Sequence, residues 1–334
     1  MYKVGISGGF INKLLISHFC VMLIVVFRLH LHMQKKSLSY LLIPLLACIW
    51  GSSFILMKRG MFTWDGAPVF SAAQVASIRI SLASVVFLPL LPKLLKHKQF
   101  IKDLPYFMIV GWGGNLIPAF LFTYAEQSLD SAIAGIMNSF TPIFTILIGY
   151  LIFKSTISKQ QIVGTLIGFT GILWLISLSH PATGKFQLAP ALTILLATLL
   201  YGISLNTIKH KLNKYNSIEI ATGGFTMALL PALIGFYFFD TPAVFRNNMM
   251  AISSFKYVAI LGLIGTAFAV IIFNRIIAQT TAVAASTITY FIPIIAVAIG
   301  IADGERFVWQ QLLAMIVIIM GVLLVNIKFK RRNY

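Results

Sequence analysis

Residues 133–153 read IAGIMNSFTPIFTILIGYLIF and contain no charged side chain. As an α-helix, a stretch of this length crosses the hydrocarbon core of a bilayer, which requires about 20 predominantly apolar residues. The stretch does not alternate apolar with polar residues, as a strand of a membrane β-barrel does. It therefore predicts a membrane-spanning helix.

Similar apolar runs recur along the whole chain. They lie near 39–57, 69–91, 105–125, 131–153, 161–178, 188–208, 218–238, 257–276, 281–301 and 311–327. Of the 334 residues, 59% are hydrophobic and 10% are charged, and the mean hydropathy is +0.92. A soluble domain carries about 25% charged residues, because its surface faces water. The sequence therefore predicts an all-α polytopic membrane protein with ten transmembrane helices in contact with the lipid bilayer.

The basic residues, which give a net charge of +18, are clustered between the apolar runs. If the first run starts in the cytoplasm, most Lys and Arg fall on that side, in segments such as 93–102, 209–214 and 328–332. Because short loops rich in Lys and Arg stay in the cytoplasm, we expect both ends of the ten-helix unit there. We expect a cell membrane, with a bacterial inner membrane favoured, and no nucleic-acid partner.

Residues 1–35 form an N-terminal extension with a shorter apolar segment, Leu14 to Phe27. This segment is short for a span and resembles the core of a signal peptide, but no small-residue cleavage site follows it. The sequence from Met33 to Lys36, in contrast, is typical of the start of a bacterial membrane protein. Two interpretations stay open: an extra N-terminal hydrophobic segment, or a true start at Met33.

The chain repeats itself after a shift of 151 residues. The shift superposes Gly51 on Gly202, Lys58 on Lys209, Gly111 on Gly262, Gly114 on Gly265, Asn115 on Thr266, Phe122 on Phe273, Ala134 on Ala285 and Pro142 on Pro293. We expect two five-helix repeats, at 36–178 and 188–330. Because five is odd, the second repeat must lie inverted in the bilayer. Inverted repeats are typical of transporters, whose substrate site lies near the midplane between the halves.

Several motifs, in the same order in both halves, resemble EamA-type members of the drug/metabolite transporter superfamily. In the first half they are Trp50-Gly-Ser-Ser-Phe54, Ala134 to Pro142, and Gln161 with Gly164 to Gly171. In the second half they are Ala285, Pro293, Gly304-Glu305-Arg306, Gln311 and Gly321. The resemblance covers residues 36–330 and implies a ten-helix inverted-repeat fold that exports amino acids, other metabolites or drugs. It does not extend to residues 154–156, Lys-Ser-Thr, where the family often has Gly-Glu-Arg.

Arg79 is the clear cation inside a predicted span. Burying a charge in lipid costs several kcal/mol, so this residue should face a wet cavity or a partner. We consider two roles, a counter-charge for a carboxylate substrate and a helix-bridging or snorkelling arginine. The other candidate cavity residues are polar or aromatic residues of the spans: Trp50, Ser52, Ser53, Asn115, Asn138, Thr141, Tyr201, Ser204, Thr266, Thr289 and Tyr290.

These candidates also have structural interpretations. Trp and Tyr anchor helix ends at membrane interfaces, and Gly and Ser allow close helix packing. The segments 111–115 and 262–266 should weaken their helices and expose carbonyl groups. Pro142 and Pro293 are expected to bend their helices and act as hinges, although static bends would look the same. Glu126, like other acids near span ends, is expected to be solvated, which leaves no obvious proton carrier.

The sequence favours a secondary transporter or facilitator that exports a small organic metabolite by alternating access. The alternatives are a drug or nucleotide-sugar carrier of the same fold, or a non-transporting membrane scaffold or sensor. We expect no enzyme activity and no catalytic residues, because the histidines are scattered and there is no GxxxxGK[ST] loop. Cys20 and Cys48 form no metal-binding pattern, so neither metal nor cofactor is expected.

Overall fold

The computed structural model describes residues 37–129, 131–178, 188–293 and 309–326, together with Ile295 and Ile299. The regular secondary structure of these residues is all helical, and their only β-pairing is an isolated bridge between Phe62 and Pro68. The N-terminal extension and the predicted Gly-Glu-Arg motif at 304–306 lie outside the described residues. The predicted all-α class is therefore confirmed for the described part of the chain.

The helices follow one another along the chain as α2 (Ser37–Met61), α3 (Ala72–Phe87), η1 (Leu88–Leu90), α4 (Leu91–Leu95), α5 (Phe100–Met108), η2 (Ile109–Leu116), α6 (Ile117–Ala125), α7 (Ser131–Asn138), α8 (Thr141–Leu151), α9 (Lys159–Leu178), α10 (Leu188–Lys211), α11 (Ser217–Phe238), α12 (Thr241–Asn247), α13 (Ala251–Gly262), η3 (Leu263–Phe268), α14 (Ala269–Gln279), α15 (Ala282–Ser286), η4 (Thr287–Tyr290) and α17 (Trp309–Asn326).

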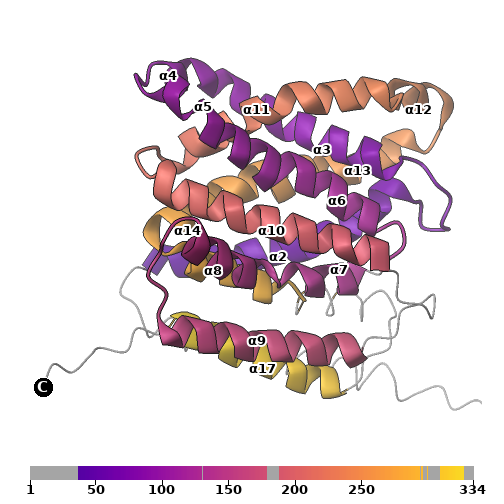
Figure 1. Ribbon diagram of the computed structural model, residues 1–334. Helices are drawn as coiled ribbons and strands as arrows, with labels where there is room; N and C mark the ends of the chain where they lie inside the picture. Colours follow the sequence, from indigo (N-terminus) through magenta and orange to yellow (C-terminus); the bar gives the residue numbers. More distant parts are fainter. Residues whose placement is uncertain are drawn as a thin grey trace, which may run out of the picture.

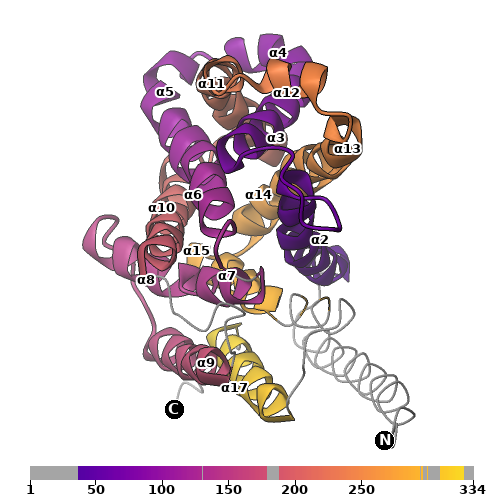
Figure 2. The same ribbon diagram turned by 90° about the vertical axis from the view of Figure 1, so that its right-hand side faces the viewer.

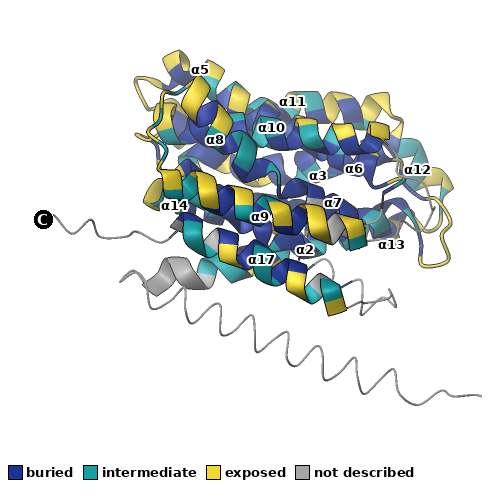
Figure 3. Ribbon diagram, turned by 60° about the horizontal axis from the view of Figure 1, so that its bottom comes forward, coloured by how far each residue is buried: buried dark blue, intermediate teal, exposed yellow. Residues whose placement is uncertain are grey.

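Six helical stretches among the described residues are long and apolar enough to span a membrane. They are Leu42–Met61, Ala72–Leu95, Phe100–Ala125, Leu188–Lys211, Ser217–Phe238 and Ala251–Gln279, and two shorter apolar helices are Thr141–Leu151 and Leu312–Val325. Large apolar side chains such as Leu166 of α9 and Leu230 of α11 are exposed. Exposed residues recur along the outer helices of the bundle (Figure 3). An exposed apolar belt of this kind suits contact with lipid, which makes the chain a multi-pass membrane protein.

The long helices run roughly side by side, with α4 and α5 at one end of the bundle and α12 at the other (Figure 1). Helix α3 leads into α4 and α11 leads into α12, so α3 and α11 run in opposite directions. These two helices pack together, as α9 and α17 do (Figure 2). Because the repeat shift places α3 on α11 and α9 nearly on α17, counterpart helices pack in pairs, which fits a two-repeat architecture.

Capping side chains fix the start of two long helices that pack against each other, α3 and α11. Ser71 caps α3 and Asn216 caps α11. In each case the residue three positions later, Gln74 or Glu219, bonds back to the backbone N–H of the cap. Such capping boxes satisfy N–H groups that a helix leaves unpaired, so these two starts are encoded locally.

The predicted span at 131–153 is divided into two helices. Helix α7 ends at Asn138 and α8 begins at Thr141, so Pro142 lies in the first turn of α8. The Thr141 hydroxyl donates to the carbonyl of Asn138 at 2.7 Å across the break. Proline is well placed in a first helical turn, because the N–H that it lacks would have no helical partner there. Pro142 therefore starts a helix, and the expected bend within one helix was wrong.

Glycines let the two halves approach at backbone distance. A Cβ atom on Gly111 of η2 would collide with the carbonyl oxygen of Gly224 of α11. A Cβ atom on Gly113, in the same turn, would have Leu200 as its nearest neighbour at 3.9 Å, which is ordinary contact. Close packing through small residues is a common way for membrane helices to associate.

We expect Gly111→Ala to destabilise the bundle by about 1–3 kcal/mol, because backbone atoms cannot move aside as a flexible side chain can. Gly113→Ala is the matched control and should leave stability nearly unchanged. Thermal unfolding of the purified protein in detergent measures both. Equal midpoints for the two variants would contradict the close approach of η2 and α11.

Candidate functional site

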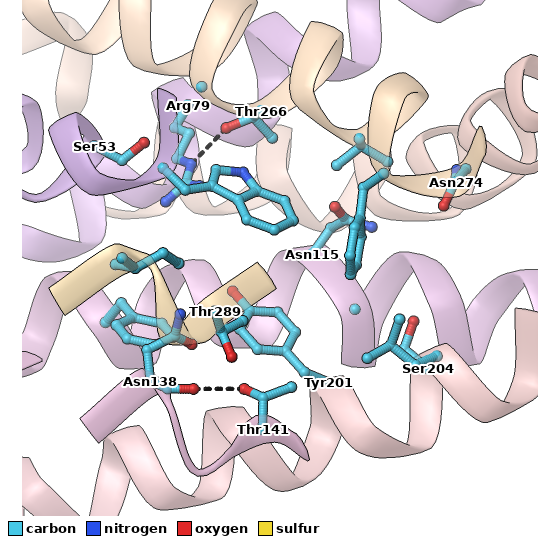
Figure 4. Close-up of a pocket in the computed structure, with 18 of the residues that line it drawn as sticks. Ser53, Arg79, Asn115, Asn138, Thr141, Tyr201, Ser204, Thr266, Asn274 and Thr289 are labelled. Carbon is cyan, nitrogen blue, oxygen red and sulfur yellow. Dashed lines mark hydrogen bonds between the residues drawn. The ribbon is translucent and has the colours of Figure 1, made fainter. Parts of the chain in front are cut away.

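A cavity lies at the centre of the bundle, between helices of both halves. Its volume is ≈ 110 Å³, and on the same measure one water molecule needs about 10–15 Å³. Ten of the residues predicted from the sequence line it: Trp50, Ser53, Arg79, Asn115, Asn138, Thr141, Tyr201, Ser204, Thr266 and Thr289 (Figure 4). The structure therefore brings together residues that are far apart in the chain.

Two predicted residues do not line this cavity. Ser52 is half-buried, and its hydroxyl donates to the carbonyl of Ile49 at 3.0 Å within α2. Tyr290 is fully buried, and its ring lies where a Cβ atom on Gly168 of α9 would be, at 2.7 Å. Both placements suit helix packing better than contact with a ligand.

Arg79 projects from α3 towards the cavity. Its Nε donates to Thr266 Oγ1 at 2.6 Å (Figure 4). Its Nη1 donates to Met57 Sδ at 3.6 Å. The side-chain ion pairs of the described residues are His97–Glu219 and Lys214–Asp103, and neither includes Arg79. The guanidinium thus lines the cavity without a carboxylate at ion-pair distance. Such a group can bind a carboxylate through two parallel hydrogen bonds.

Thr266 and Asn115 occupy equivalent places in two π-helical segments. Segment η2 covers Ile109–Leu116 and η3 covers Leu263–Phe268, in register with the repeat shift. Asn115 Nδ2 donates to Val110 O at 3.0 Å, and Thr266 Oγ1 donates to Leu261 O at 2.9 Å. Each partner lies five residues earlier, which matches π-helical spacing. The expectation that these glycine-containing segments depart from regular helix is therefore confirmed.

Aromatic rings form much of the apolar wall. Trp50 and Phe273 meet edge to face with ring centroids 4.8 Å apart, and Phe122 stacks on Tyr201 at 6.0 Å. Phe54 meets Phe122 at 6.1 Å. All five rings line the cavity. A wall of aromatic groups with a few polar ones is typical of small-molecule sites, since the rings bury apolar area and the polar groups set orientation.

Asn274, a weaker candidate from the sequence, also lines the cavity, whereas sequence reasoning missed several other lining residues: Phe54, Met57, Ile80, Val110, Phe122, Leu205, Ile208, Val270, Phe273 and Ile292. The repeat offered a signal for two of these, because Phe122 and Phe273 are counterparts in it. Glu126 was expected to be solvated, but its exposed fraction is only 5%. That expectation was wrong: the side chain is buried, and α3 and α10 pack against α6.

A polar cluster connects the halves at the end of the bundle near α5. Asp103 of α5 accepts from Lys214 Nζ and from the Tyr215 hydroxyl, each at 2.7 Å. Burial, together with the hydrogen bond to Asp103, raises the pKa of the Tyr215 phenol, so it stays protonated at neutral pH. His97 and Glu219 add a contact of 3.1 Å between the same two regions. These bonds tie the first half to the start of α11.

The bundle of apolar helices around a polar and aromatic cavity defines the class, a polytopic membrane protein with an internal cavity. The EamA-like transporter family matches the sequence twice, over residues 37–177 and 188–327. The chain therefore belongs to this family, and the resemblance in its motifs is confirmed.

Several relatives match most of the chain. "Uncharacterized transporter YoaV" of Bacillus subtilis (strain 168) is 23% identical over 290 residues, which cover 85% of this chain and 95% of that protein. "Probable terminal-alkyne amino-acid exporter" of Streptantibioticus cattleyicolor is 22% identical over 283 residues, or 83% and 86% of the two chains. An "Uncharacterized transporter" of Archaeoglobus fulgidus is 22% identical over 193 residues, 58% of this chain and 65% of that protein.

A solved crystal structure shares the fold. Its TM-score is 0.63 at 13% identity, and the match covers 87% of this chain and 97% of that chain. At this identity the match supports a shared fold and no conclusion about function. The family match and the named relatives together make this chain a membrane transporter of the drug/metabolite type.

Proposed function

We propose that the chain is a secondary transporter or facilitator for small organic metabolites that carry a carboxylate, with amino acids as the main class. The supporting observation is Arg79, whose guanidinium lines the cavity and has a hydroxyl and a thioether, rather than a carboxylate, as its partners. A substrate carboxylate supplies the missing counter-charge. The aromatic wall suits an apolar side chain on the same substrate.

The transport cycle that we propose is alternating access between two inverted five-helix repeats. The packing of α3 on α11 and of α9 on α17 supports this topology. Two like halves that rock about a shared axis have inward-open and outward-open states of similar energy. We place both ends of the ten-helix unit in the cytoplasm of a bacterial cell, because Lys and Arg concentrate in the segments expected on that side.

Export is the direction we propose for this transport. A relative is named as a probable amino-acid exporter and matches 83% of this chain. That relative supports both the substrate class and the direction. The drug-carrier and scaffold alternatives predict different substrates, or none.

The test is counterflow in proteoliposomes with pairs of probes that differ only by the carboxylate. Radiolabelled leucine and phenylalanine should exchange, whereas 3-methylbutylamine and phenethylamine, their decarboxylated analogues, should not. Equal exchange of the amines would remove the carboxylate from the proposal. No exchange of any member of the full set of proteinogenic amino acids would overturn the amino-acid class.

A further inference from the structure

Glu126 is a buried carboxylate at the end of α6. Its exposed fraction is 5%, and both carboxylate oxygens are shielded from solvent. Neither oxygen has a hydrogen-bond partner within the described part of the chain. An ionised carboxylate in such a place costs several kcal/mol unless a partner compensates for it.

The position of Glu126 connects it to the cavity. Its backbone N–H donates to the carbonyl of Phe122 at 3.0 Å, so the two residues lie one helical turn apart. Phe122 lines the cavity and stacks on Tyr201. Glu126 is therefore one turn beyond the cavity wall, on the same helix.

The charges that act on Glu126 come from two other helices. They are Arg79 on α3 and Lys58 on α2, and Tyr201 on α10 lines the same cavity as Arg79. Neither cation is at ion-pair distance from Glu126 among the described residues. Their fields favour the ionised carboxylate, whereas burial favours the neutral acid. Neutralising the charge of Arg79 would therefore shift Glu126 towards its neutral form.

The repeat provides an internal comparison. The counterpart of Glu126 is Ile277, which is fully buried, and the counterpart of Lys58 is Lys209. Lys209 Nζ donates to the carbonyl of Ile277 at 3.1 Å. In the second half, the lysine therefore meets the backbone of a position with an apolar side chain. The fold accommodates an apolar residue there, so the carboxylate in the first half is not required by packing.

A metal ion does not suit this place. Calcium takes 6–8 oxygen ligands, whereas Glu126 supplies one carboxylate, and the charges of Arg79 and Lys58 that act on it are positive. A proton needs only one carboxylate oxygen and removes the buried charge. The proton is therefore the cation that this environment can accept.

We infer that Glu126 is a proton-binding site coupled to carboxylate binding at Arg79, an inference that rests on the function proposed above. A substrate carboxylate neutralises Arg79 and adds negative charge near Glu126. Both effects favour protonated Glu126, so substrate binding takes up one proton from water. By linkage, protonation of Glu126 strengthens substrate binding, and affinity falls as the pH rises through the titration of Glu126.

The first experiment needs no substrate. Infrared difference spectra of the purified protein in lipid, recorded over a pH titration, follow the C=O band of a protonated carboxyl group. Wild type should show a band that persists at a pH where exposed acids are ionised, and Glu126→Gln should lack it. Asp240→Asn, at an exposed position with φ 51° that asparagine tolerates, should keep the band. A band that persists in Glu126→Gln would overturn the inference.

The second experiment measures leucine counterflow against pH. Wild type should lose affinity for leucine at least ~10-fold between acid and alkaline pH, and Glu126→Gln should be nearly pH-independent because it mimics the protonated acid. Glu126→Ile, which introduces the side chain found at the counterpart Ile277, replaces it if the glutamine variant does not fold. If Glu126→Gln kept the pH profile of wild type, the coupling would be overturned and the proposed function would stand. A Glu126 infrared band in a protein that does not transport leucine would support the proton site and contradict the proposed function.

Discussion

Replacing Arg79 with leucine is expected to reduce leucine and phenylalanine transport by about 30-fold or more. Removing one partner of a buried charged hydrogen-bonded pair costs about 2–5 kcal/mol, and each 1.4 kcal/mol is a factor of ten in affinity. Arg79→Lys should transport at a rate between those of wild type and Arg79→Leu, because lysine keeps the charge but lacks the planar fork that binds a carboxylate bidentately. Counterflow in proteoliposomes measures all three proteins.

The fold should tolerate the loss of this arginine. Thr266 still donates to the carbonyl of Leu261 at 2.9 Å without Arg79, and the repeat has Leu230 at the matching position. Arg246→Leu is the control, since it removes the same charge from an exposed place on α12. We expect Arg246→Leu to transport like wild type. Both Arg246→Leu and Arg79→Leu should unfold near the wild-type temperature. Transport by Arg79→Leu equal to that of the control would end the counter-charge role.

Features encoded within one stretch of chain were predictable from the sequence. The segments 111–115 and 262–266 combine glycines with a polar residue, and they occur twice in register, so a departure from regular helix could be expected in both. Asn115 and Thr266 both line the cavity, and each donates to a carbonyl group five residues earlier. Their matching positions in the two repeats distinguished Asn115 and Thr266 from other polar residues of the spans.

Features that depend on neighbouring helices were not predictable in this way. Glu126 lies near the end of its span, and its sequence position gave no sign that the fold would bury its side chain. The break before Pro142 was interpreted as a bend, because the sequence alone does not show where one helix stops and the next begins. Phe54 lies one turn from Trp50 on α2, so helical spacing could have found it.

Filling the cavity is the change that separates a carrier from a scaffold. Val270 of α14 lines the cavity and is half-buried, so Val270→Trp places an indole in the space that a substrate would occupy. We expect amino-acid counterflow to fall by more than ~10-fold. Overpacking costs about 1–3 kcal/mol, and a loss of 1.4 kcal/mol in binding free energy is already a tenfold loss of affinity.

The matched control for this change is Val85→Trp, which adds the same side chain at a 53% exposed position on α3. This variant should transport like wild type, because its indole faces outward, where the bilayer accommodates aromatic groups. A scaffold or sensor would work equally well with its cavity filled, because its contacts lie on the outer surface. A carrier would not, because substrate and indole compete for one volume of ≈ 110 Å³. Equal transport by the two tryptophan variants would therefore place the substrate path outside this cavity. It would also contradict the proposed binding of substrate by Arg79.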